Sequence, residues 1–280
     1  PFMINAQSGQ ELSFARLREQ VAHLRNRQDA AGLQPGDKVS VYMPNGPLPA
    51  LLLLGIMAGG LVVNPINLLS QPSQLAYVLG HSDTRLVFTC QEHLPALQQA
   101  LAQVEREVGV ALCDPESMRV PPVPVLAGGA SPGQLLAHRI QPGEPALIMY
   151  TSGTTGVPKG VLLSHANLIA NAGSTSDVHQ LAERDRVMVS LPLYHINALV
   201  VALVTPLFHG GSLVMVPRFS ASTFWADVCR FGCTWINVVP TIIAYLLNDA
   251  AGAAGLGLQG IRFCRSASAA LAPEHHRAFE

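Results

Sequence analysis

Hydrophobic residues recur along the chain with two different periods. Between Phe14 and Ala31 they stand three or four positions apart, the spacing of one face of a helix, at Phe14, Leu17, Val21 and Leu24. Gly32 follows, where a glycine commonly ends a helix. Residues 39–43 instead have strand composition and are bounded by turn residues on both sides. This pattern predicts a helix followed by a strand.

The same alternation continues through the rest of the chain. It predicts helices over residues 51–58, 71–79 and 242–247, and short apolar strands over residues 61–63, 86–89, 146–150 and 161–163. Ser164 is the expected N-cap of the helix after the last of these strands. Strands that alternate with helices predict an α/β fold of layered sheets and helices.

Two segments stand out from this alternation. The apolar stretch from Pro49 to Val63 contains three glycines and is shorter than the roughly 18 to 20 residues that span a bilayer. It is predicted to be a buried helix followed by a strand, so no membrane span is expected. Between Pro115 and Pro145, prolines and glycines crowd together, which indicates a surface connection or a boundary between two lobes.

Composition narrows the class of protein. Hydrophobic residues make up 49% of the 280 residues and charged residues 12%, which excludes a disordered chain. With 17 Lys+Arg against 18 Asp+Glu the net charge is −1, so nucleic acid is not an expected partner. No basic segment precedes an apolar leader core, and the five scattered cysteines are expected to be reduced thiols. The expected location is the cytoplasm.

The loop between the strands predicted at 146–150 and 161–163 has the composition of a phosphate-binding site. It contains four hydroxyl side chains, glycines that let backbone N–H groups converge, and one lysine, namely Thr151, Ser152, Gly153, Thr154, Thr155, Gly156 and Lys159. The alternative is a flexible surface turn. The loop does not match the phosphate loop G-x-x-x-x-G-K-[ST], because Lys159 precedes Gly160 and a strand follows instead of a helix.

The run from Tyr150 to Gly160 closely resembles the signature of the AMP-forming acyl-CoA synthetases, a family that includes luciferases and peptide-synthetase adenylation domains. Further similarities occur in the family's order over most of the chain, at residues 12–17, 32–39, 44–45 and 58–65. The resemblance implies a two-step reaction. A carboxylate attacks the α-phosphate of ATP to give acyl-AMP and pyrophosphate, and a thiol, usually that of coenzyme A, then displaces AMP, with Mg²⁺ required.

The resemblance also implies roles for individual residues. The loop hydroxyls and Lys159 would hold the β- and γ-phosphates. A lone histidine after an apolar run, such as His195, is more often structural. The resemblance reverses this, because His195 ends a Leu-Pro-Leu-Tyr-His motif that borders the acyl pocket and the ATP site, and it implies a catalytic role for His195. The segment Arg265 to Leu271 occupies the place of a glycine-rich turn that lines the acyl group and adenine, so Ser268 and Ala269 are expected to contact the nucleotide.

The turn at 265–271 departs from the family pattern in a way that bears on the substrate. Serines replace glycine positions there, which predicts a more polar pocket. The expected acid-binding residues are His195, Asn197, Asn237 and Ser266, with Arg265 near them. The chain looks most similar to oxalate-CoA and carnitine-CoA ligases, so a small or polar acid is expected. The alternative is that Arg265 points to solvent and Asn197 caps a helix.

The resemblance covers only the N-terminal part of such an enzyme. Residues 1–280 are expected to form an incomplete AMP-binding domain, with the ribose-binding aspartate and the C-terminal domain that carries the catalytic lysine absent. Residues before about Asn45 and after about Thr205 are expected to share one lobe. Two other functions remain open: an adenylation domain that loads a carrier-protein thiol, and a non-catalytic nucleotide-binding fragment.

Overall fold

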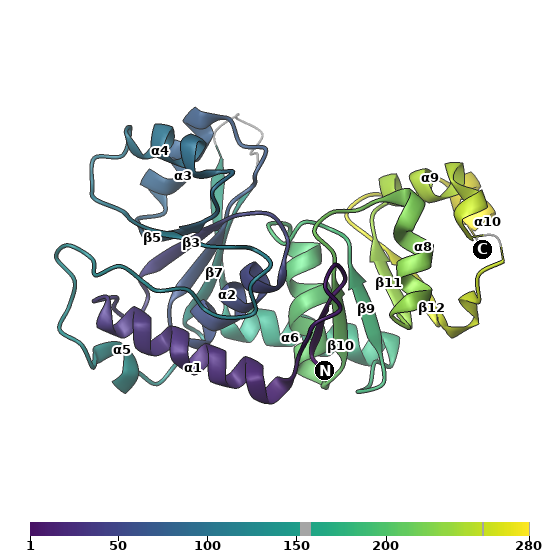
Figure 1. The fold of residues 1–280 in the computed structure, drawn as a ribbon, viewed down its shortest axis with the longest axis horizontal. Coiled ribbons are helices and arrows are strands. Elements are labelled where there is room, and N and C mark those ends of the chain that lie inside the picture. The colour runs from purple at the N-terminus through teal and green to yellow at the C-terminus, as the bar shows by residue number, and fades with distance from the viewer. Residues whose placement is uncertain (152–157, 254, 280) are drawn as a thin grey trace. The chain divides into compact units, whose positions relative to one another are not determined.

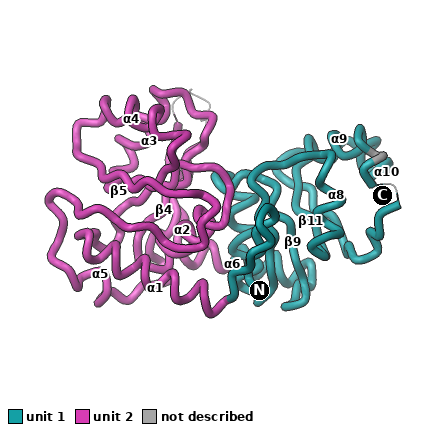
Figure 2. Tube along the Cα trace, in the orientation of Figure 1, with its two compact units in different colours: residues 1–13, 170–280 teal, residues 14–169 magenta. Residues whose placement is uncertain are grey.

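The fold is seen in a computed structural model that describes residues 1–151, 158–253 and 255–279. The chain divides into two compact units, residues 1–13 with 170–280 and residues 14–169 (Figure 2). One unit is thus built from both ends of the chain, as expected, but the expected boundaries near Asn45 and Thr205 are wrong. The helix His165–His179 runs through the boundary at residue 169 without a break, so no turn or linker in the sequence marks this boundary.

Residues 14–169 contain a six-stranded sheet of order β6-β5-β3-β4-β7-β8 (Figure 1). Its first five strands are parallel, and the edge strand β8 is antiparallel to β7. The strands are β3 (Lys38–Tyr42), β4 (Val62–Pro65), β5 (Thr84–Thr89), β6 (Gly109–Leu112), β7 (Pro145–Thr151) and β8 (Lys159–Ser164). The predicted α/β fold with layered sheets is confirmed in this unit.

The helices of this unit are α1 (Phe14–Ala30), α2 (Pro47–Ala58), α3 (Pro72–His81), α4 (Leu94–Leu101), α5 (Gln134–Ala137) and α6 (His165–His179), the last of which continues past residue 169. Helices α2, α3, α4 and α5 connect consecutive parallel strands of this sheet, whereas α1 precedes β3 and α6 follows β8. Helix α2 begins four residues before its predicted start at Leu51, because prolines in a first turn lack only N–H groups that have no intrahelical partner there. The predicted N-cap role of Ser164 is confirmed, because its Oγ accepts a hydrogen bond from the Asn167 backbone N–H at 3.2 Å.

The irregular segment between β6 and β7 is held by polar side chains of α1. Asp29 is 4% exposed, and its carboxylate accepts hydrogen bonds from the backbone N–H groups of Gly133, Leu135 and Leu136 at the start of α5. Arg25 donates to the Leu135 carbonyl oxygen at 2.8 Å. The predicted surface connection therefore carries one short helix, and α1 fixes its course.

Residues 1–13 and 170–280 contain a second six-stranded sheet, of order β12-β11-β9-β10-β1-β2. Five strands are again parallel, and β2 at the edge is antiparallel to β1. The strands are β1 (Met3–Asn5), β2 (Glu11–Leu12), β9 (Arg186–Val189), β10 (Ser212–Met215), β11 (Trp235–Val238) and β12 (Phe263–Ser266).

A π-helix, η1 (Asn197–Val204), follows β9 and continues directly into α7 (Thr205–His209). The Val200 carbonyl oxygen accepts from both the backbone N–H and the Oγ1 hydroxyl of Thr205, the hydroxyl at 3.0 Å. π-Helical turns are rare and occur often at functional sites. The remaining helices of the unit are α8 (Ala221–Arg230), α9 (Pro240–Asn248), η2 (Ala250–Ala253), η3 (Leu258–Gly260) and α10 (Pro273–Phe279).

Candidate functional site

Thr151 and Lys159 lie at the two ends of the predicted phosphate loop. Strands β7 and β8 form a hairpin in which Thr151 pairs with Lys159 and Tyr150 with Gly160. Both Thr151 and Lys159 are exposed. Ser152, Gly153, Thr154, Thr155 and Gly156 lie outside the described residues. The hairpin therefore places one predicted hydroxyl and the predicted lysine opposite each other, where the loop leaves the sheet.

Gly160 allows the Tyr150 ring to pack closely across this hairpin. A Cβ atom at position 160 would lie 3.2 Å from Tyr150 Cζ and 3.1 Å from Ile148 Cδ1. Both distances are tighter than nearly all real contacts of that kind. A Cβ atom at position 160 would therefore require the Ile148 or Tyr150 side chain to shift by a few tenths of an ångström.

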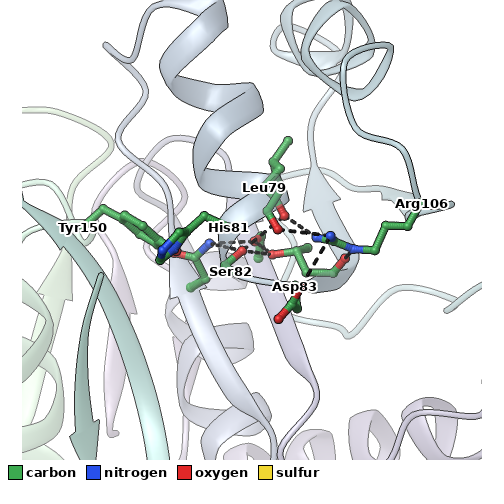
Figure 3. A network of polar contacts seen from close by, with 10 residues as sticks. Leu79, His81, Ser82, Asp83, Arg106 and Tyr150 are labelled. Carbon is green, nitrogen blue, oxygen red and sulfur yellow. Dashed lines mark hydrogen bonds and ion pairs between the residues drawn. The ribbon is translucent and has the colours of Figure 1, made fainter. Parts of the chain in front are cut away.

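Tyr150 also contacts His81, the last residue of α3 (Figure 3). The Tyr150 hydroxyl and His81 Nδ1 are 2.8 Å apart, and the two rings meet edge to face. Burial raises the pKa of Tyr150 to about 12, so the phenol is protonated at neutral pH and can donate to the imidazole. Sequence analysis missed His81, because no local pattern links two residues that are 69 positions apart.

Arg106 fixes the end of α3 that carries His81 (Figure 3). Its guanidinium donates to the carbonyl oxygens of Leu79, Gly80 and Thr84, the last two at 3.1 Å. Asp83, which lies 3.6 Å from the Arg106 guanidinium, has a left-handed φ of 54°. The last carbonyl groups of a helix have no partner within the helix, and Arg106 supplies one.

Four other predicted site residues lie in the second sheet, at or beyond the carboxyl ends of its parallel strands. His195 and Asn197 follow β9, Asn237 lies near the end of β11, and Ser266 ends β12. These three strands are parallel neighbours in the order β12-β11-β9. Ligands of open α/β sheets bind outside the carboxyl ends of parallel strands, so the fold brings these four residues to the edge at which a ligand is expected.

Asn197, Asn237 and Arg265 form one hydrogen-bonded group, here called the Arg265 cluster. Arg265 Nη1 lies 2.8 Å from Asn197 Oδ1 and 2.8 Å from Asn237 Oδ1 and donates to both. Asn237 Nδ2 donates to the Asn197 carbonyl oxygen at 3.2 Å. The alternative in which Arg265 points to solvent and Asn197 only caps a helix is wrong, because a sheet neighbour and the start of η1 hold the guanidinium.

His195 and the turn after β12 lie outside this hydrogen-bonded group. His195 is exposed, and the centroid of its ring lies 4.6 Å from that of the Tyr194 ring. Partial desolvation lowers the pKa of His195. The Ser266 Oγ is buried without a hydrogen-bond partner among the described residues, and strand alternation directs Ser266 and Arg265 to opposite faces. Ser268 and Ala269 are exposed, and Ser268 has a left-handed φ of 73°.

Neither a membrane helix nor a metal cluster occurs in the described part of the chain. None of its helices is both long and apolar enough to cross a bilayer. Within residues 1–151, 158–253 and 255–279, no three His, Cys, Asp or Glu side chains are grouped so that they could hold a metal ion.

Comparisons with known proteins show what the whole chain is similar to. The family described as AMP-binding enzyme matches residues 1–280. A sulfoacetate--CoA ligase of Cupriavidus necator is 56% identical over 280 residues, all of this chain and 54% of that protein. An oxalate--CoA ligase of Arabidopsis thaliana is 32% identical over 269 residues, 94% of this chain and 51% of that protein.

A solved structure supports the same fold. ATP-bound MatB from Rhodopseudomonas palustris has a TM-score of 0.81 and 26% sequence identity, and the match covers 99% of this chain and 54% of that one. The chain thus spans about half the length of the relatives that it matches.

Proposed function

Because the chain belongs to the AMP-binding enzyme family, we propose that it supplies the ATP-binding and acid-binding part of an acid–thiol ligase. In the proposed reaction, a carboxylate oxygen attacks the α-phosphorus of ATP and pyrophosphate leaves. The thiol of coenzyme A then attacks the acyl carbon, the thioester C–S bond forms, and AMP leaves. Both named relatives are CoA ligases, which supports coenzyme A over a carrier-protein thiol as the acceptor.

The observation that carries the proposal is the pairing of Thr151 with Lys159 across the β7–β8 hairpin. The strands hold an exposed ammonium group and a hydroxyl at the ends of a loop whose sequence adds Ser152, Gly153, Thr154, Thr155 and Gly156. An ammonium group and converging donors suit the oxygens of a polyphosphate. They would stabilise the negative charge that develops on departing pyrophosphate.

The residues present fit a magnesium ion that is carried by the nucleotide. Hydroxyl and ammonium groups bind phosphate oxygens, and Mg²⁺ in such sites is held mainly through substrate phosphates and water, with few protein ligands. When bound, the ion would neutralise charge on the phosphates. Thr151 and Lys159 would then orient the same phosphates from the protein side.

The acid is proposed to bind at the carboxyl ends of β9, β11 and β12. His195, Asn197 and Asn237 would line the site, with Ser268 and Ala269 toward the nucleotide. Ser266 points to the other face of β12 and would reach the site only at the carboxyl end of that strand. A pocket for a long alkyl chain would be apolar throughout, since each buried methylene contributes about 0.8 kcal/mol, whereas this edge holds a guanidinium and two amides. We therefore propose a compact polar acid, and sulfoacetate and oxalate, in the names of the two relatives, are the first candidates.

Lys159 offers a direct test in a protein of the relatives' full length. Replacing Lys159 with Ala should slow acid-dependent ATP–pyrophosphate exchange by at least about tenfold, the effect of one lost charge-assisted contact. The chain's only other lysine, Lys38, begins the central strand β3 at the amino ends of the parallel strands, whereas Lys159 lies beside the carboxyl end of β7. Lys38→Ala is therefore the matched control. Equal rates in the Lys159→Ala variant and the wild type would contradict the proposed phosphate site.

A further inference from the structure

The Arg265 cluster is fixed by the backbone of two adjacent strands. Asn237 on β11 and Arg265 on β12 are direct partners in the parallel register, so their side chains leave the sheet on the same face. Figure 1 shows these two strands side by side. Asn197 comes from the first residue of η1. The guanidinium is thus positioned by three elements, close to the carboxyl edge of the sheet.

The charge of Arg265 is not neutralised within the described part of the chain. No described carboxylate forms an ion pair with it, and its two recorded hydrogen bonds go to neutral amide oxygens. Arg262, three residues earlier, differs because its Nη1 lies 2.7 Å from the buried Asp185 carboxylate. Partial burial disfavours the charged form of the guanidinium and lowers the pKa of Arg265.

Donor groups remain at the cluster after these bonds are formed. A guanidinium has about five N–H donors, and both recorded hydrogen bonds start from Nη1. Asn197 is 7% exposed, and its Nδ2 is buried without a partner among the described residues. Because Arg265 donates to Asn197 Oδ1, the orientation of that amide is set and Nδ2 is its donor end. A buried donor without an acceptor is unfavourable.

We propose that Arg265 is a specificity-determining residue that binds a second anionic group of the acid substrate, a carboxylate or sulfonate at the end remote from the activated carboxyl. Asn197 and Asn237 are positioning residues that hold the guanidinium through Nη1. A planar fork of N–H donors matches the oxygens of such a group. The proposal rests on the proposed function, since it concerns the acid that the same site would activate.

The test compares two acids of similar shape in a protein of the relatives' full length. Sulfoacetate carries a sulfonate where 3,3-dimethylbutanoate carries a neutral tert-butyl group. Arg265→Met should lower kcat/KM in pyrophosphate exchange for sulfoacetate by at least about 30-fold more than for 3,3-dimethylbutanoate, the range of lost charge-assisted hydrogen bonds. The loss should appear mainly as a higher KM. Arg230→Met is the control, because Arg230 is exposed at the end of α8, away from the carboxyl edge.

A second variant tests the cluster without removing the guanidinium. Asn237→Asp keeps the size of the side chain and places a carboxylate against Arg265 Nη1, so it should compete with the substrate anion and also weaken selection of sulfoacetate. Compared with Arg265→Met, Arg265→Lys should retain part of the preference for sulfoacetate over 3,3-dimethylbutanoate, because lysine keeps the positive charge.

The outcomes separate the two proposals. Equal losses for both acids in Arg265→Met, with an unchanged melting temperature, would overturn the inference and indicate contact with a group that all substrates share. Unchanged selectivity in both Arg265→Met and Asn237→Asp would overturn it as well. Absence of exchange by the wild-type protein with every acid tested would instead contradict the proposed function.

Discussion

At the scale of single residues, Gly46 shows how one missing side chain can secure a helix start. It precedes α2, and a Cβ atom at this position would overlap the carbonyl oxygen of Pro115 and lie 2.9 Å from its carbonyl carbon. That carbonyl oxygen accepts a hydrogen bond from the Leu48 backbone N–H at 3.1 Å. The first N–H groups of a helix need partners outside it, and Gly46 leaves room for this one.

We therefore expect Gly46→Ala to lower the free energy of unfolding by about 1 to 3 kcal/mol, the usual effect of overpacking. Gly80→Ala is the matched control, because a Cβ atom there meets nothing within 4 Å. Within α3, alanine is favoured over glycine by about 0.5 to 1 kcal/mol, so the control should be neutral or stabilising. Urea unfolding measures both, and a Gly46→Ala variant as stable as the wild type would show that the Pro115 contact yields easily.

The single-residue roles at the candidate site were only partly predictable. The residue types that suggested a polar pocket, Asn197, Asn237 and Arg265, do lie together. Their pairing was not visible in the sequence, because Arg265 and Asn197 are 68 positions apart and meet only through the strand order. At the C-terminal end of η1, the Thr205 hydroxyl donates to the Val200 carbonyl oxygen, a contact that no hydrophobic period indicates.

At the scale of elements, Asp185 joins the amino ends of three strands of the second sheet. Its buried carboxylate accepts hydrogen bonds from Arg262 Nη1 at 2.7 Å, Thr234 Oγ1 at 2.9 Å and the Ala182 backbone N–H at 2.8 Å. Burial alone would raise the pKa of Asp185, but these hydrogen bonds and the Arg262 charge outweigh it, so the pKa is lowered. The ionised carboxylate therefore stabilises the folded unit.

The sign of the pH dependence follows from this shift. The stabilisation is fully present above the unfolded-state pKa of about 3.9 and is lost as the pH falls through the lower folded-state pKa. At pH 7, Asp185→Asn should lower the free energy of unfolding by about 1.5 to 3 kcal/mol, and the difference from the wild type should shrink near pH 3. Asp177→Asn, at an exposed position on α6, should change stability by less than about 0.5 kcal/mol. A difference that is equal at both pH values would contradict this role of Asp185.

The helices and strands that the hydrophobic pattern predicted individually are present with bounds close to the predicted ones. Helix α1 ends one residue before its predicted end, and Gly32 follows with a left-handed φ of 86°. Strands β7 and β8 flank the predicted loop. What the pattern could not provide was the strand order, since β1 pairs with β10 more than 200 residues later, and such pairing depends on tertiary packing.

At the scale of the whole molecule, both units use the same plan of five parallel strands with one antiparallel edge strand. Each carries its candidate site residues at carboxyl ends of parallel strands, Thr151 in one unit and the Arg265 cluster in the other. The relatives are about twice as long as the matching stretch, since this chain spans 54% of the sulfoacetate--CoA ligase. From the resemblance to acyl-CoA synthetases, we expect the catalytic lysine in a further part of that kind.

Residues 1–280 expressed alone are therefore expected to form acyl-AMP at least about a hundredfold more slowly than a protein of the relatives' full length, because a group that stabilises the transition state would be missing. Single-turnover formation of acyl-AMP from radiolabelled ATP measures this. Comparable rates would show that the 280 residues hold a complete adenylating site.

Acid-dependent ATP–pyrophosphate exchange by the full-length protein tests the central claim most directly, with sulfoacetate, oxalate, butyrate, benzoate and palmitate as the acids. The account predicts exchange that requires an acid, with the highest kcat/KM for a compact acid that bears a second anionic group. A preference for palmitate of more than about a hundredfold, roughly 2.7 kcal/mol of transition-state stabilisation, would contradict it.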